Sequence, residues 1–171
     1  ISKYSCNSLN AWGWYAISFE EDLNNNDKES ALYKAIETDV NFTEASLRLA
    51  YYQLKNKEKE SKIISNFENT YKELNYNLLN YYGNLAFINK DYFVSSIFYE
   101  YSLKLEIKQD IPFKHLLKSY FEIHNKDKLS FWLDEYLKNI KHENLDFEIL
   151  PYYFLLCNRN EDALKVSELA I

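Results

Sequence analysis

The chain has 171 residues, 47% of them hydrophobic and 27% charged, so its composition is that of a globular protein and excludes a disordered one. Its formal net charge of −6 argues against a partner bound through a phosphate backbone, which requires a basic surface. Only two glycines and two prolines occur, and so few turn-forming residues favour helices joined by short connections.

No run of apolar residues is long enough to cross a bilayer, so we expect no membrane-spanning segment in this chain. The chain begins at Ile1 and contains no methionine, which indicates a processed form or a fragment; a signal or anchor upstream stays open. The localisation is therefore unknown, and a place in a cell envelope would require such an upstream signal or anchor.

The first two helix pairs are expected over residues 10–41 and 42–75, after a lead-in at residues 1–9. Apolar residues recur at helical spacing in both pairs. The positions that carry this pattern are Trp12, Tyr15, Ala16, Phe19, Ala35 and Ile36 in the first pair, and Leu49, Ala50, Leu54, Ile63 and Ile64 in the second. Both pairs are therefore predicted to be amphipathic helices.

The clearest pair lies over residues 76–109. One face of its first helix carries Leu79, Tyr82, Gly83 and Ala86 at spacings of three and four. One face of its second helix carries Tyr92, Ser95, Tyr99, Ser102 and Leu103. The small residue Gly83 predicts a close approach of the two helices.

The fourth and fifth pairs are expected over residues 110–143 and 144–171. We expect the first helix of the fourth pair to begin after Pro112, since proline is tolerated at a helix start. Pro151 lies inside the apolar pattern of the fifth pair, around Phe147 and Phe154, so a kink or a late start is expected there.

A polar, asparagine-led break recurs along the chain and divides each predicted pair. The breaks begin at Asn25, Asn56, Asn89, Asn125 and Asn158. Their spacings are 56−25=31, 89−56=33, 125−89=36 and 158−125=33. A period in this range is typical of a helical solenoid, and asparagine suits the turn because it tolerates the left-handed conformation.

The third pair resembles the tetratricopeptide (TPR) repeat, with large, aromatic and small residues at the positions of that pattern from Leu79 to Ser102. Ala86 stands where an aromatic residue is usual, and no proline closes the unit. The resemblance implies an all-α, right-handed superhelical solenoid of about five antiparallel hairpins, forming a single domain over residues 1–171. It also implies a non-enzymatic interaction module or scaffold, such as those of bacterial envelope complexes.

Proteins of this kind bind a partner protein or peptide on the concave face that the first helices line. Transferred position by position, the resemblance gives partner-binding candidates in four of the pairs. They are Leu47, Tyr51, Leu54, Lys55, Asn80, Asn84, Phe87, Ile88, Lys114, Lys118, Phe121, Tyr152, Leu155 and Leu156. This mixture of apolar and amide side chains suits an apolar or helical segment better than an acidic tail.

No catalytic constellation is found, and we expect no cofactor and no metal. The segment Asp22–Asp27 has the alternating oxygen ligands of a calcium loop but lacks its glycine and its closing glutamate, since Asp27 and Tyr33 stand there. The histidines and cysteines show no metal spacing. Two alternatives stay open: an RNA-binding helical repeat, although nucleic acid is not the expected partner, and a non-catalytic all-α domain of an enzyme. Strong salt dependence of binding would favour the RNA alternative.

Overall fold

The computed structural model describes residues 6–56, 61–65 and 74–169, and these residues are all-α, with no strand among them. This confirms the all-α part of the predicted fold. The chain divides into two compact units, Ile1–Leu74 and Asn75–Ile171, each of which has its own helices. The predicted break at Asn56–Glu58 lies mostly outside the described residues.

The first unit contains α1 (Leu9–Ile17), α2 (Asn25–Thr38) and α3 (Thr43–Lys55), and residues 61–65 are also helical. Its core is aromatic: the ring of the fully buried Phe42 lies 4.6 Å from that of Trp12 and 5.0 Å from that of Tyr15. The connection between α1 and α2 ends at Asn24, whose side-chain oxygen accepts a hydrogen bond from the backbone N–H of Asp27. The predicted break at Asn25 is therefore wrong by a few residues.

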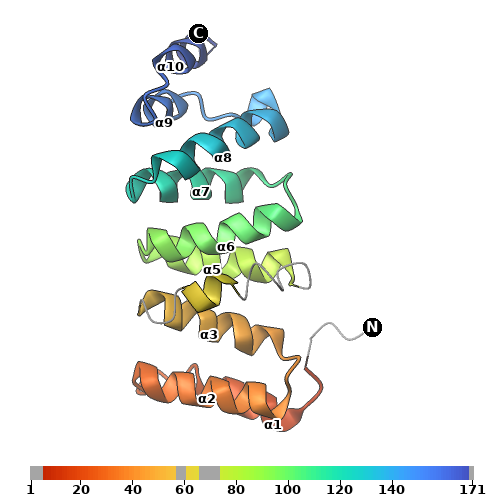
Figure 1. Cartoon of the computed structure of the whole chain (residues 1–171). Coiled ribbons are helices and arrows are strands. Elements are labelled where there is room, and N and C mark those ends of the chain that lie inside the picture. Colours follow the sequence, from red (N-terminus) through yellow and green to blue (C-terminus); the bar gives the residue numbers. More distant parts are fainter. Residues whose placement is uncertain (1–5, 57–60, 66–73, 170–171) are drawn as a thin grey trace. The chain divides into compact units, whose positions relative to one another are not determined.

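The second unit contains three successive helix pairs (Figure 1). They are α5 (Tyr76–Ile88) with α6 (Tyr92–Leu105), α7 (Asp110–Glu122) with α8 (Lys126–Asn139), and α9 (Leu150–Leu156) with α10 (Asn160–Glu168). A short 3-10 helix, η2 (His142–Asn144), lies between α8 and α9. Each helix packs against the next, and α7 also contacts α5 and α9. The first helices of the three pairs thus form one continuous layer.

The predicted buried face of α5 is confirmed, whereas α6 is buried on all sides from Val94 to Leu103 and its predicted face is not distinguished. The buried residues of α5 are the four predicted ones, Leu79, Tyr82, Gly83 and Ala86. A Cβ atom added to Gly83 would lie only 3.0 Å from the ring of Tyr99 on α6. The missing side chain of Gly83 therefore makes the space in which the Tyr99 ring packs.

The three turns inside these pairs share one geometry. A residue with positive φ ends each first helix: Lys90 (61°), His124 (55°) and Asn158 (61°). The next backbone N–H in each turn donates to the carbonyl five residues earlier, at 2.9, 3.0 and 2.9 Å; these bonds are Asp91 to Ala86, Asn125 to Tyr120 and Arg159 to Phe154. This is the Schellman arrangement, which satisfies carbonyl groups at a helix end.

The structural period of the second unit is 34 residues, because 124−90=34 and 158−124=34. The asparagines themselves are spaced by 36 and 33 residues instead of 34, because they occupy different turn positions. Asn89 precedes the left-handed residue, Asn158 is that residue, and Asn125 follows it as the N-cap of α8. Asn125 caps that helix by accepting a hydrogen bond from the N–H of Lys128.

The two prolines lie in the first turns of their helices. Helix α7 begins at Asp110, so the prediction of a start after Pro112 is wrong, although the missing N–H of proline is harmless in a first turn. The late start predicted at Pro151 is confirmed, because α9 begins at Leu150 and has only seven residues. Phe147 belongs to the connection that precedes this helix.

A buried carboxylate joins α6, α7 and α8. Glu100 accepts hydrogen bonds from the Tyr120 hydroxyl and from Lys128, at 3.0 Å, and forms an ion pair with Lys104 at 2.8 Å. Burial alone would raise the pKa of Glu100, but the hydrogen bonds from Lys104, Tyr120 and Lys128 outweigh it and lower that pKa. The carboxylate therefore stays ionised while it links two successive pairs.

Candidate partner-binding site

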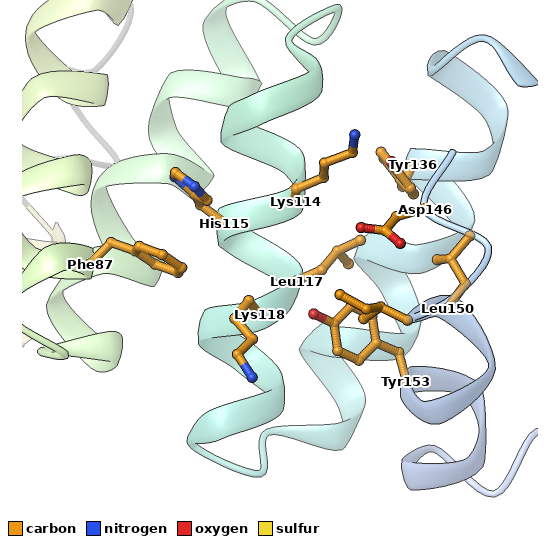
Figure 2. Close-up of a pocket in the computed structure, with 10 residues that line it drawn as sticks. Phe87, Lys114, His115, Leu117, Lys118, Tyr136, Asp146, Leu150 and Tyr153 are labelled. Atoms are coloured by element: carbon orange, nitrogen blue, oxygen red, sulfur yellow. The ribbon is translucent and has the colours of Figure 1, made fainter. Parts of the chain in front are cut away.

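A pocket of about 240 Å³ lies in the second unit, among the first helices of the three pairs (Figure 2). Side chains from α5, α7, α8 and α9 and from the connection before α9 surround it. Its lining consists of Phe87, Lys114, His115, Leu117, Lys118, Tyr136, Asp146, Ile149, Leu150 and Tyr153. Most of these groups present carbon atoms, so the pocket is an apolar space with a few charged groups.

One wall is a stack of two rings. Phe87 of α5 lies parallel to His115 of α7, with 4.1 Å between ring centroids and 14° between ring planes. The Tyr99 hydroxyl donates to Asn84 Oδ1 at 3.0 Å and lies 2.8 Å from His115 Nδ1. Because the hydroxyl proton is used on Asn84, the network assigns the Nδ1–H tautomer to His115. Burial lowers the pKa of His115, which favours this neutral ring.

Two lysines of α7 contribute their aliphatic stems, and their charges are paired with neighbours on the same helix. Lys114 Nζ lies 3.1 Å from Asp110, and Lys118 Nζ lies 2.5 Å from Glu122. Lys118 Nζ also lies 5.4 Å from the centroid of the Phe121 ring. Both ion pairs are partly exposed, so they contribute little to stability.

The opposite wall comes from Tyr136, Tyr153 and the connection before α9. The Tyr136 hydroxyl donates to the backbone carbonyl of Asn144 at 3.2 Å, which attaches the connection to α8. Burial raises the pKa of Tyr153, and the negative charge of Asp146 raises it further. This phenol therefore remains protonated and can donate a hydrogen bond.

The structure separates the fourteen predicted binding residues into groups. Leu47, Tyr51 and Leu54 are buried in the first unit, at 1%, 5% and 1% exposure, so they offer no surface to a partner in this conformation. Lys55 is exposed at the end of α3.

The remaining predicted residues belong to the second unit. Three of them, Phe87, Lys114 and Lys118, line the pocket, and three more, Ile88, Tyr152 and Leu155, are exposed on α5 and α9. Asn80 donates to Gln109 at 2.6 Å, and Asn84 accepts the bond from Tyr99, so both amides already have intramolecular partners. Phe121 and Leu156 are half-buried against the core.

Seven lining residues were not predicted as site residues: His115, Leu117, Tyr136, Asp146, Ile149, Leu150 and Tyr153. Asp146 and Ile149 lie in the connection between α8 and α9, which is longer than the connection between α6 and α7. The only sequence signal for this longer connection is Pro151, which delays the start of α9. The remaining residues follow the helical period, and such a pattern is typical of core residues as well as of a pocket.

Among the described residues, no group of three or more His, Cys, Asp or Glu side chains is arranged to hold a metal ion. The same part of the chain contains no helix with the length and apolar character needed to cross a membrane. The two cysteines, Cys6 and Cys157, are free thiols.

Comparison of the chain with models of protein families, with curated protein sequences and with solved structures gives no match. The class of protein is therefore defined by the structure. The chain is a helical repeat-like all-α protein in which, within each unit, adjacent helices pack in chain order.

Proposed function

We propose that this chain is a TPR-like solenoid that acts as a non-enzymatic interaction module and binds a segment of a partner protein. The binding surface is the layer formed by α5, α7 and α9. The observation that carries the proposal is the pocket shared by these three helices, since residues of successive repeats converge on one apolar recess.

The repeat geometry of the second unit supports the TPR-like part of the proposal. Its turns recur every 34 residues, which is the period of TPR helix pairs. The small residue Gly83 lies at the close approach of α5 and α6, where that repeat pattern places a small side chain. The right-handed superhelix that the resemblance implies is part of this proposal.

The apolar surface of the same layer supports the proposal that it binds a partner segment. Ile88 is 74% exposed on α5, and Tyr152 and Leu155 are 65% and 51% exposed on α9. Large apolar side chains that are exposed on a helix layer can serve as contacts in protein recognition. They would contact a segment whose largest side chain enters the pocket.

The proposal is tested by affinity capture with the native full-length protein, followed by measurement of the dissociation constant for the captured partner. Leu155→Ser on α9 should weaken binding by about 1–2 kcal/mol, because it removes an apolar contact at the surface. Leu164→Ser is the matched control, since Leu164 is 62% exposed on α10, a second helix of its pair.

Equal loss of binding in both variants, or no loss in either, would show that the partner does not use the α5–α7–α9 layer. Both substitutions are at exposed positions, so both proteins should unfold close to the parent midpoint. Binding that weakens steeply with salt and extends to RNA would favour the nucleic-acid alternative instead.

A further inference from the structure

The charged groups around the pocket differ in whether they have a partner. Lys114 and Lys118 are each paired one helical turn away, with Asp110 and Glu122. The carboxylate of Asp146 makes no side-chain hydrogen bond or ion pair to any described residue. In Figure 2 this carboxylate points from the connection before α9 into the space beside Leu117. The charged group of the pocket lining that has no paired neighbour is therefore the negative carboxylate of Asp146.

A second polar group in the pocket also lacks a partner. Tyr153 is only 5% exposed, and its hydroxyl has no hydrogen bond to any described residue. Figure 2 shows its ring reaching from α9 toward Leu117 and Lys118 of α7, with the hydroxyl at the pocket. Because this hydroxyl oxygen is not itself sealed from solvent, it can donate a hydrogen bond to a group that enters the pocket.

The size of the pocket limits what can occupy it. Sites for whole small molecules are usually about 300–1,000 Å³ and enclose most of the ligand. The present pocket has about 240 Å³, so it suits one bulky side chain of a longer segment. Its walls of Phe87, Leu117 and Leu150 favour an aliphatic or aromatic side chain.

We infer that the pocket receives an apolar anchor residue of a partner protein segment that carries Lys or Arg beside this anchor, with the cation paired to Asp146. The Tyr153 hydroxyl donates to a backbone carbonyl of the same segment. This inference rests on the proposed function and specifies the chemistry of its partner. The chain's net charge of −6 attracts a basic segment at longer range.

The test uses the full chain to select binders from a displayed library of random 12-residue peptides. The enriched peptides should share a large apolar residue within one helical turn of Lys or Arg. A synthetic copy of the best peptide is then titrated by calorimetry into the parent, Asp146→Asn and Tyr153→Phe proteins. Each variant should bind the peptide about tenfold more weakly. Asp146→Asn loses the charged acceptor of a hydrogen bond, and Tyr153→Phe loses a hydrogen-bond donor.

Two controls make the result specific. Glu148→Gln removes the same charge from an exposed residue two positions away and outside the pocket lining, so it should change the dissociation constant less than about twofold. Replacing the basic residue of the peptide by Gln should weaken binding to the parent about tenfold but leave binding to Asp146→Asn unchanged. The parent arm of this second control uses the unchanged protein, so its outcome does not depend on folding of a variant.

Different results would contradict the inference about the pocket and the proposed function. Enriched peptides that are acidic, or that bind Asp146→Asn as tightly as the parent, would overturn the inference. The proposed function would still stand if Leu155→Ser weakens their binding. A library that yields no binding peptide, or only peptides insensitive to Leu155→Ser, overturns both.

Discussion

Gly83 on α5 lies directly against the ring of Tyr99 on α6, so closely that a Cβ atom at Gly83 would be 3.0–3.1 Å from three ring atoms. Tyr99 is 1% exposed and is held by its hydrogen bonds to Asn84 and His115. The ring therefore cannot move aside without breaking the network behind the pocket. This contact determines how closely the first pair of the second unit can pack.

Gly83→Leu should destabilise the protein by about 1–3 kcal/mol, because the added side chain overpacks the α5–α6 contact. Unfolding in urea, followed by circular dichroism, measures the loss. Gly13→Ala is the control: Gly13 also lies in a helix, but nothing is within 4 Å of its added Cβ. It should stabilise α1 by about 0.5–1 kcal/mol, and an unchanged midpoint for Gly83→Leu would contradict the packing described above.

The three left-handed turn residues should respond to glycine in a defined order. Lys90→Gly and His124→Gly should each stabilise the protein by about 0.5–1 kcal/mol, because glycine adopts positive φ without the cost that other residues meet. Asn158→Gly should gain less, since asparagine already tolerates this conformation. Thermal unfolding ranks the three variants. Asn89→Gly, at φ −79°, should give no gain, and a gain there would argue against the assigned turn register.

Phe87→Ala should lower stability by about 1–3 kcal/mol, since the ring is half-buried and stacks on His115. Ile88→Ala, at the adjacent and 74% exposed position, should change stability by less than about 0.5 kcal/mol. Denaturant unfolding of both variants distinguishes a core role from a surface role. Equal stability of the two variants would show that the Phe87 ring does not contribute to the core.

Glu100→Gln should lower stability at pH 7 by about 1–3 kcal/mol, because Lys104, Tyr120 and Lys128 lose a charged acceptor. The folded-state pKa of Glu100 lies below its ordinary value of 4.5, so the stabilisation is present above pH 4.5 and is lost as the pH falls through the folded pKa. The parent and the variant should therefore converge in acid. Urea unfolding at pH 7 and at pH 3.5 measures this, with Glu148→Gln as an exposed control that should follow the parent at both values.

The sequence by itself determined the helix pairs and the buried face of α5. Leu79, Tyr82, Gly83 and Ala86 could be assigned because the helical period of 3.6 residues places such spacings on one face. The late start of α9 also followed from a local rule, since proline disrupts the interior of a helix but is tolerated in its first turn. These features depend on residues close together in the chain.

The exact turn register depended on hydrogen bonds that composition does not show. Lys90 and His124 occupy left-handed positions that asparagine was expected to take, because the Schellman bonds to Ala86 and Tyr120 stabilise the turn whatever its side chain. The asparagine spacing therefore approximated the 34-residue period without giving it.

The existence and the lining of the pocket depend on the tertiary structure alone. Helical periodicity shows that a face is apolar, but not whether another part of the chain covers it: Leu47 and Leu54 are buried, whereas Ile88 and Leu155 are exposed. Phe87, Asp146 and Tyr153 lie up to 66 positions apart (153−87=66) and meet only because α5, α7 and α9 form one layer. Their convergence results from packing between successive pairs, which no local pattern encodes.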